Sequence, residues 1–239
     1  MEKLEDFLKS YDGGKVLDIA CGSGSFTSRQ IAALNSYSSV TGLDIKADLE
    51  ADFLENVEGH DISFVVSPIR DYLQTTDRFD TISVSNALHH LEGVGDVLKD
   101  IQKILNPSGT FIVNEMYSDG LNPAQETQRD LHRFMAGLHR VAGEFHRGAF
   151  TRDEIQGFLD QAGLRVLHRF RVSNEDGPVK KETDGKGGFL ERVMGAVERA
   201  FPDGAPAEVA EELEGLASRA AEIGVGSPPQ LTFVCRYED

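Results

Sequence analysis

The stretch Val16-Leu17-Asp18-Ile19-Ala20-Cys21-Gly22-Ser23-Gly24-Ser25-Phe26 decides the fold of this chain. An apolar run typical of a buried strand passes into a loop with small residues at positions 20, 22 and 24, and a helical pattern follows at once. Small residues allow a ligand to approach the backbone closely. In an α/β sheet such a ligand binds at the carboxyl ends of the strands, beside the point where the strand order reverses.

Asp18 distinguishes this loop from one that binds a dinucleotide. In the dinucleotide fingerprint a third glycine or alanine follows the second glycine by three positions, and Thr27 stands there in this chain. The carboxylate of Asp18 would repel a pyrophosphate and attract a cation. S-adenosylmethionine carries an ammonium and a sulfonium group and no phosphate. We therefore expect a cationic sulfur nucleoside, with a nicotinamide-dependent oxidoreductase as the competing interpretation.

A second acidic residue, Asp44, ends the segment Val40-Thr41-Gly42-Leu43-Asp44-Ile45. A carboxylate at the end of the second strand can accept hydrogen bonds from both hydroxyls of a ribose. The alternative is that Asp44 caps a helix. Together with Asp18 it indicates a nucleoside site.

Strand and helix patterns alternate through most of the chain, which predicts β-α-β units and a doubly wound parallel sheet. The expected strands are 16–20, 39–44, 62–67, 79–85, 110–115, 164–172 and 230–237. The expected helices are 25–35, 47–57, 94–105, 122–143, 151–162, 190–200 and 207–223. Asn106-Pro107-Ser108-Gly109 predicts a turn, and Thr151-Arg152-Asp153-Glu154 predicts a capping box.

Two segments interrupt this alternation. The helix within 122–146 predicts a lid, and 174–226 predicts a helical insertion that forms a cap, with a mobile loop over 174–188. Residues 1–173 and 227–239 would then form the cofactor-binding core.

Four ordered motifs make residues 16–115 resemble the core of the class I S-adenosylmethionine-dependent methyltransferases. They are Asp18-x-Ala20-x-Gly22-x-Gly24, with alanine where the family usually has glycine; Asp44; Arg78 to Leu91; and Leu105 to Thr110. The resemblance implies a seven-stranded, mostly parallel sheet whose last strand is antiparallel. It also implies S-adenosylmethionine as cofactor and methyl transfer as activity.

The resemblance also implies which residues bind the cofactor. They are Asp18, Ala20, Gly22, Ser23, Gly24, Asp44, Ile45, Ser67, Pro68, Ile69 and Asn86. Pro68 stands where the family often has an acid that binds the adenine amino group, so Ser67 or the backbone of Ile69 would substitute. Asn86 would offer its backbone carbonyl to the methionine end of the cofactor.

The candidate catalytic residues are His89, Glu115 and His146, although displacement at a sulfonium methyl needs no universal catalytic side chain. The alternatives are a structural histidine, a solvated strand end and an amphipathic helix bordered by histidines. His132, His139 and His146 are spaced by seven residues. We expect no metal, because His132 and His139 would lie about 10 Å apart along a helix.

Composition narrows the partners and the compartment. The formal net charge of the 239 residues is −16, which disfavours binding to nucleic acid. No apolar run is long enough to span a membrane, the first residues are charged, and two cysteines suit a reducing compartment. We expect a cytoplasmic monomer or homodimer that methylates a small-molecule acceptor. A protein or RNA methyltransferase and a non-catalytic S-adenosylmethionine-binding protein remain as alternatives.

Overall fold

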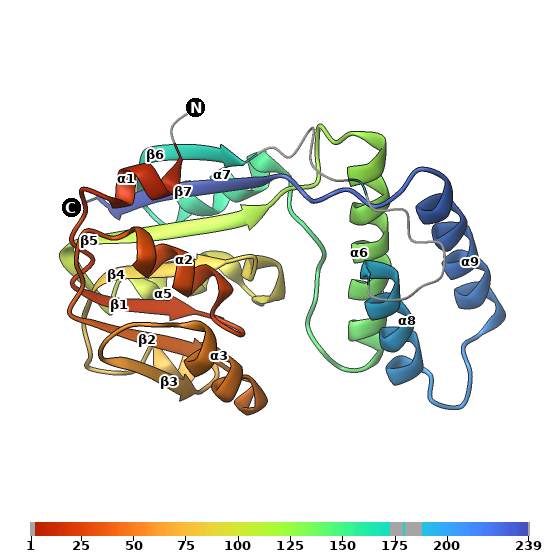
Figure 1. Cartoon of the computed structure of the whole chain (residues 1–239), viewed down its shortest axis with the longest axis horizontal. Coiled ribbons are helices and arrows are strands. Elements are labelled where there is room, and N and C mark those ends of the chain that lie inside the picture. Colours follow the sequence, from red (N-terminus) through yellow and green to blue (C-terminus); the bar gives the residue numbers. More distant parts are fainter. Residues whose placement is uncertain (1–2, 173–178, 180–187, 239) are drawn as a thin grey trace.

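The computed structural model describes residues 3–172, 179 and 188–238. The loop predicted over 174–188 lies almost entirely outside the described residues. A seven-stranded sheet lies at the centre of the fold, and Figure 1 shows its parallel strands running toward a layer of helices. The strands are β1 (Lys15–Ile19), β2 (Ser39–Asp44), β3 (Ile62–Val66), β4 (Phe79–Ser85), β5 (Leu105–Met116), β6 (Leu164–Val172) and β7 (Gln230–Tyr237).

The strand order is β3-β2-β1-β4-β5-β7-β6. The first five strands pair in parallel, and β7 is antiparallel to both of its neighbours, β5 and β6. The predicted seven-stranded, mostly parallel sheet with an antiparallel last strand is confirmed. The order reverses between β1 and β4, so the carboxyl ends of these two strands flank the switch point.

The helices lie on both faces of the sheet and beyond its carboxyl edge (Figure 1). The α-helices are α1 (Leu4–Leu8), α2 (Ser25–Ala33), α3 (Glu50–Asn56), α4 (Ile69–Tyr72), α5 (Val94–Ile101), α6 (Pro123–Val141), α7 (Arg152–Gln161), α8 (Phe189–Ala200) and α9 (Ala207–Glu222). Two 3₁₀ turns, Ala47–Leu49 and Leu88–His90, complete the described elements. Among the described residues, no helix is both long and apolar enough to cross a membrane.

Alternate strand residues point to opposite faces of the sheet and enter different hydrophobic clusters. Leu17 and Ile19 of β1 pack in a cluster with α5 and α7, whereas Val16 packs in a cluster with α1, α2 and α3. The same alternation occurs in β5, where Phe111 and Val113 lie on one side and Ile112 lies on the other. Helices therefore cover both faces, as the β-α-β pattern predicts.

The largest difference from the expected element boundaries lies between α5 and β5. The helix predicted over 94–105 ends at Ile101, and β5 begins at Leu105. Ile104 and Leu105 are apolar because they are buried in the sheet cluster, not because they continue the helix face. The predicted turn over 106–109 falls inside the ladder as an irregularity, where the partners of β4 step from Leu105 to Thr110.

Three helices form a layer beyond the carboxyl ends of the parallel strands: α6, α8 and α9 (Figure 1). They share a hydrophobic cluster of their own, in which Leu131 and Leu138 of α6 pack with Leu190 and Val193 of α8 and Ala220 of α9. A capping box opens α6 at Asn122, and the predicted capping box at Thr151 opens α7. The layer places α6 opposite the switch point of the sheet.

Candidate functional site

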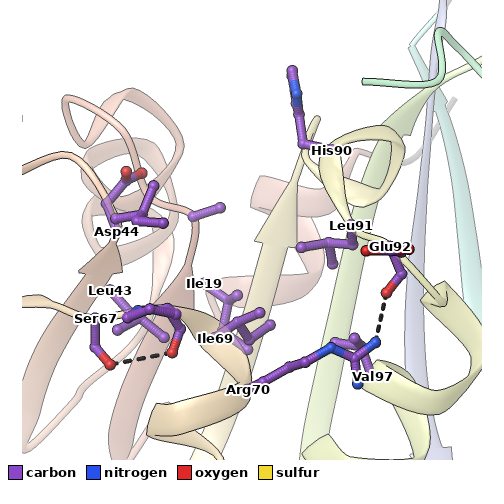
Figure 2. A pocket seen from close by; sticks show the side chains of 13 residues that line it. Ile19, Leu43, Asp44, Ser67, Ile69, Arg70, His90, Leu91, Glu92 and Val97 are labelled. Atoms are coloured by element: carbon purple, nitrogen blue, oxygen red, sulfur yellow. Dashed lines mark hydrogen bonds between the residues drawn. The ribbon is translucent and has the colours of Figure 1, made fainter. Parts of the chain in front are cut away.

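A cavity of about 410 Å³ opens at the switch point, at the carboxyl ends of β1 and β2 and beside the turn after β4 (Figure 2). Its volume falls within the range of about 300–1,000 Å³ that is usual for small-molecule sites. The lining residues are Ile19, Ala20, Leu43, Asp44, Ile45, Ser67, Pro68, Ile69, Arg70, His90, Leu91, Glu92 and Val97. Most of the wall is apolar, and few charged groups enter it.

Asp44 is the carboxylate that lies between the cavity and the small-residue loop. Its Oδ2 accepts a hydrogen bond from the Gly22 amide at 2.9 Å, and its Oδ1 accepts one from the Lys46 amide at 3.0 Å. These bonds fix the carboxylate, and each oxygen retains a lone pair. Asp44 can therefore accept two further hydrogen bonds from a ligand in the cavity, which is the geometry that adjacent hydroxyls require.

The walls beside Asp44 suit a flat apolar ring. The Ile45 side chain is 65% exposed although it is large and apolar, and it lies at the cavity mouth. On the other side, Pro68 precedes α4 and Ile69 begins it, and both line the cavity. The Ser67 hydroxyl donates to the Pro68 carbonyl at 3.1 Å, so this hydroxyl is engaged within the chain (Figure 2).

The small-residue loop requires the conformational freedom that its sequence predicts. Gly22 and Gly24 have φ angles of +56° and +81°, and Ala20 has a φ of +54°. This left-handed region costs an L residue about 1–2 kcal/mol, so Ala20 stores strain where glycine is usual. A Cβ on Gly22 would meet nothing within 4 Å, which leaves the backbone open to a ligand beside Asp44.

Asp18 lies behind the loop and does not line the cavity. Its side chain is buried, and its carboxylate accepts hydrogen bonds from Thr27 of α2 at 2.5 Å and from Ser83 of β4 at 2.8 Å. Burial raises the pKa of Asp18 to about 6, against the lowering effect of these two hydroxyls. The side chain therefore acts on the site through the loop and its electrostatic field, and not by lining the wall.

The cavity brings together six of the residues predicted to bind the cofactor: Ala20, Asp44, Ile45, Ser67, Pro68 and Ile69. Gly22 adjoins it through its bond to Asp44, whereas Asp18, Ser23, Gly24 and Asn86 do not line it. Asn86 has a φ of +49° and its side-chain oxygen accepts from the Met116 amide, so it joins the ends of β4 and β5.

Sequence reasoning missed three contributors from α4 and the turn after β4, namely Arg70, Leu91 and Glu92, and it did not assign His90 to the cofactor. Arg70 donates to the Glu92 carbonyl at 2.8 Å and closes the floor of the cavity (Figure 2). The sequence did offer one signal for these residues: positions 88–92 come shortly after the strand at the switch point, where ligands bind in α/β sheets.

Glu115 and His89, both predicted as catalytic candidates, form one buried unit. The Glu115 carboxylate lies 3.1 Å from His89 Nδ1, and it also accepts from the backbone amides of Leu88 and Met116. These three contacts fix the position of the buried carboxylate. A hydrogen bond from His89 Nδ1 to Glu115 leaves the Nε2 lone pair for the other neighbours of the ring.

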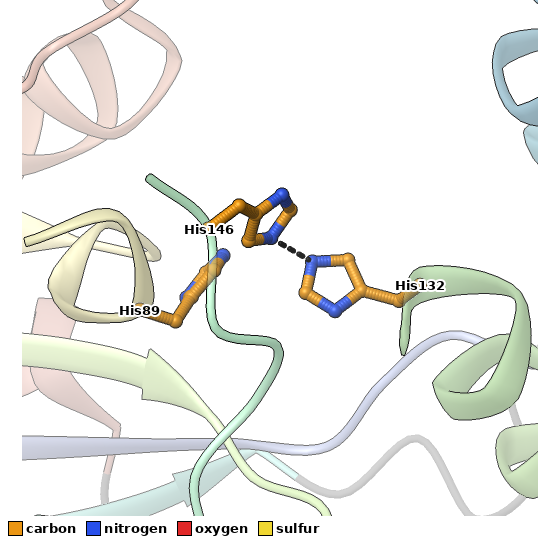
Figure 3. Close-up of side chains that lie close together, drawn as sticks. All are labelled: His89, His132 and His146. Atoms are coloured by element: carbon orange, nitrogen blue, oxygen red, sulfur yellow. Dashed lines mark hydrogen bonds between the residues drawn. The ribbon is translucent and has the colours of Figure 1, made fainter. Parts of the chain in front are cut away.

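His146 lies beside this unit, because the segment after α6 returns over the turn that follows β4 (Figure 3). The Arg147 amide donates to the His89 carbonyl at 3.0 Å, and Arg140 donates to the His146 carbonyl at 2.6 Å. His146 Nε2 lies 3.2 Å from His132 Nε2, and its Nδ1 lies 2.9 Å from His139 Nδ1. The expectation of border histidines on an amphipathic helix is thus wrong for His132, which is 4% exposed and faces His146.

We call the gathered rings of His89, His90, His132, His139 and His146 the histidine cluster. Burial lowers the pKa of His132 to about 4 and also lowers the pKa of His146, and the neighbouring histidines add to both effects. His90 joins the cluster to the cavity, because it lines the cavity and its ring centroid lies 4.1 Å from that of His146. The cluster therefore adjoins the cavity at His90.

Comparison with known proteins agrees with this geometry. A family model described as a methyltransferase domain matches residues 10–163, which is more than half of the chain. The chain therefore belongs to this family, and its predicted membership of the class I S-adenosylmethionine-dependent methyltransferases is confirmed.

Its relatives differ in what their names say they act on. The chain is 25% identical over 178 residues to the ubiquinone/menaquinone biosynthesis C-methyltransferase UbiE of Hahella chejuensis. This alignment covers 68% of this chain and 71% of that protein. The chain is also 20% identical over 174 residues to the tRNA U34 carboxymethyltransferase of Campylobacter curvus. That alignment covers 72% of this chain and 55% of that protein. The chain thus spans little more than half the length of the second relative.

Among solved structures, the S-adenosylmethionine-dependent methyltransferase of Geobacter sulfurreducens in complex with S-adenosyl-L-homocysteine has a TM-score of 0.60 and 17% identity. The superposition covers 98% of this chain and 89% of that one. A methyltransferase of Thiobacillus denitrificans, also in complex with S-adenosyl-L-homocysteine, gives a TM-score of 0.60 at 16% identity. At these identities the likeness shows the fold.

Proposed function

We propose that this chain transfers the methyl group of S-adenosylmethionine to a small-molecule acceptor that enters beside the histidine cluster. The observation that carries the proposal is the cavity at the switch point, in which a fixed carboxylate, Asp44, lies between apolar walls and an open small-residue loop. A nucleoside with a cationic tail fits this set of groups. A dinucleotide does not, because a buried Asp18 lies behind the loop where a pyrophosphate would lie.

Each part of the cofactor has a matching group in this arrangement. Asp44 would accept both ribose hydroxyls, and Ile45 and Ile69 would enclose the adenine ring. The ionised form of Asp18 would stabilise the ammonium group through the loop, while Gly22, Ser23, Gly24 and the Asn86 carbonyl would contact the methionine end. The bound sulfonium supplies an activated methyl group, so the chain has to provide alignment and exclusion of water.

The acceptor would meet imidazole rings of the histidine cluster. His89 and His146 have low exposure and would border the acceptor, whereas Glu115 positions His89. The helices α6, α8 and α9 would enclose the acceptor, with 122–146 as the lid and 174–226 as an insertion into the core of 1–173 and 227–239. A net charge of −16 disfavours the RNA acceptor that one relative's name suggests.

Calorimetry with S-adenosylhomocysteine, S-adenosylmethionine and NAD tests the cofactor. We expect both sulfur nucleosides to bind with one site per chain and NAD to bind at least tenfold more weakly, since each factor of ten requires about 1.4 kcal/mol. Methyl turnover from labelled S-adenosylmethionine against a pool of quinols, phenols and amines, and against tRNA, then tests the acceptor. Tighter binding of NAD would overturn the proposal, and turnover on tRNA alone would replace the small-molecule acceptor.

Replacement of Asp18 by Asn should stabilise the ligand-free protein while it weakens cofactor binding. The folded chain binds the Asp18 proton more tightly than the unfolded chain between pH 4 and 6, so this residue's contribution to stability falls as the pH rises through that window. We expect Asp18→Asn to add about 1–2 kcal/mol to the free energy of unfolding at pH 7.5, part of the shift being offset by weaker hydrogen bonds to Thr27 and Ser83. The gain should disappear near pH 4.

Urea unfolding at both pH values and calorimetry with S-adenosylhomocysteine measure the two effects. Asp48→Asn is the matched control, because Asp48 is exposed and lies in the 3₁₀ turn after β2. A variant that gains no stability at pH 7.5 would contradict the assigned burial of charge. Unchanged affinity would show that Asp18 has no part in holding the cofactor.

A further inference from the structure

Three histidines of the cluster come from different elements and point toward one another (Figure 3). His89 lies in the turn after β4, His132 lies on α6, and His146 lies in the segment that returns from α6. One nitrogen from each ring lies within 4.8 Å of a nitrogen from each of the others, and none of the three side chains is more than 4% exposed. Such a convergence is typical of a metal site.

The separations are close to those that a metal requires. Two nitrogens bound to one tetrahedral Zn²⁺ at about 2.0–2.1 Å are about 3.3 Å apart. His132 Nε2 and His146 Nε2 are already 3.2 Å apart. His89 offers the third nitrogen, which lies within 4.8 Å of the other two, while its Nδ1 contacts Glu115.

The surroundings of His89 also suit ligation. Glu115 provides the second-shell contact that orients metal-binding histidines, since its carboxylate accepts the His89 Nδ1 proton. The same carboxylate supplies negative charge next to a cation.

We propose that His89, His132 and His146 bind one divalent first-row transition-metal ion of the Zn²⁺ type, with Glu115 as second-shell partner. Three nitrogen ligands favour Zn²⁺, Co²⁺ or Ni²⁺ over Mg²⁺, which prefers oxygen. Three protein ligands leave the fourth coordination position of a tetrahedral metal open for water or an acceptor atom. This last role deepens the proposed function and rests on it: the metal would hold an acceptor oxygen or thiol where His90 joins the cluster to the cavity.

The expectation of no metal rested on His132 and His139 as the pair of ligands. His146 changes that geometry, because it lies within hydrogen-bond distance of both and contributes from outside the helix. His139 contacts His146 on the side away from His132 and is not one of the three proposed ligands.

Metal binding is tested on untagged full-length protein that has been stripped with a chelator and dialysed. Titration with Co²⁺, followed by visible absorption, and with Zn²⁺, followed by calorimetry, should give one site per chain. Mg²⁺ should neither bind nor compete. X-ray absorption at the zinc edge of the wild-type complex should show about three imidazole nitrogens, which requires no variant and therefore does not depend on how a variant folds.

Three variants assign the ligands. Glu115→Gln should lower Zn²⁺ affinity about 10–100-fold, as loss of a second-shell partner does, and His132→Gln and His146→Gln should each lower it further. His60→Gln is the matched control, since His60 stacks on Tyr37 outside the cluster and its loss should leave the affinity unchanged. Binding of S-adenosylhomocysteine by each variant verifies the fold.

The outcomes separate the metal site from the proposed function. Wild-type protein that binds S-adenosylhomocysteine but binds Zn²⁺ no better than His132→Gln or His146→Gln would overturn the metal site and leave the methyltransferase proposal intact. Zinc bound without imidazole in its coordination shell would also overturn it. Stoichiometric metal without cofactor binding would overturn the proposed function and leave the metal site standing.

Discussion

Replacement of Asp44 by Ala is expected to weaken binding of S-adenosylhomocysteine about 100-fold or more. A charge-assisted hydrogen bond contributes about 1.5–3 kcal/mol, and Asp44 is positioned to make two of them to a ribose. The variant also frees the Gly22 amide, which the carboxylate holds at 2.9 Å, so the loop loses an anchor next to the cofactor. Calorimetry at one ionic strength measures the change in Kd.

Two comparisons make this measurement specific. Asp48→Ala removes an exposed carboxylate four residues further on and controls for the change in net charge. A cofactor analogue without the 2′-hydroxyl should bind wild type more weakly than S-adenosylhomocysteine does, and Asp44→Ala should not distinguish the two ligands. If Asp44→Ala binds S-adenosylhomocysteine as tightly as wild type does, the ribose lies elsewhere.

Gly24→Ala is expected to lower the free energy of unfolding by about 2–4 kcal/mol, through left-handed strain and overpacking together. Gly24 has a φ of +81°, and an added Cβ would lie 2.4 Å from Val57 Cγ2 and 3.0 Å from Phe53 Cδ2. Both neighbours are buried, so neither side chain can move aside without a change in the core. Urea unfolding followed by circular dichroism measures the loss.

Gly22→Ala separates the two causes. Gly22 also has a positive φ, +56°, but its added Cβ would meet nothing within 4 Å. We expect this variant to lose only the backbone contribution of about 1–2 kcal/mol and yet to bind S-adenosylhomocysteine at least tenfold more weakly, because the methyl group would extend toward the nucleoside. Equal losses of stability in the two variants would argue against the packing explanation for Gly24.

The fold and the nucleoside side of the site could be predicted from local pattern. Strand periodicity, the small residues at 20, 22 and 24 and the acid at Asp44 are short-range signals, and parallel topology brings their strand ends together. The sequence did not reveal that Asp18 is buried behind the loop. Its neighbours Thr27 and Ser83 lie 9 and 65 residues away, and only the packed sheet brings the three together.

The histidine cluster could not be predicted from local sequence pattern. Helical geometry correctly separates His132 from His139 along α6, but it says nothing about a segment that leaves the helix. His146 comes between them because Arg140 binds its carbonyl and Arg147 binds the carbonyl of His89. These contacts connect residues up to 58 positions apart, Arg147 and His89, and they depend on tertiary structure.

The separate hydrophobic cluster of α6, α8 and α9 has a consequence for how this protein can diversify. Among the described residues, this cluster contains no strand residue. Substitutions within it would therefore repack the layer of α6, α8 and α9 and leave the sheet and its loops undisturbed. Such substitutions would change the free energy of unfolding of the sheet little. Relatives that share the sheet and its loops could then come to act on different acceptors, because each would have a different α6–α8–α9 layer.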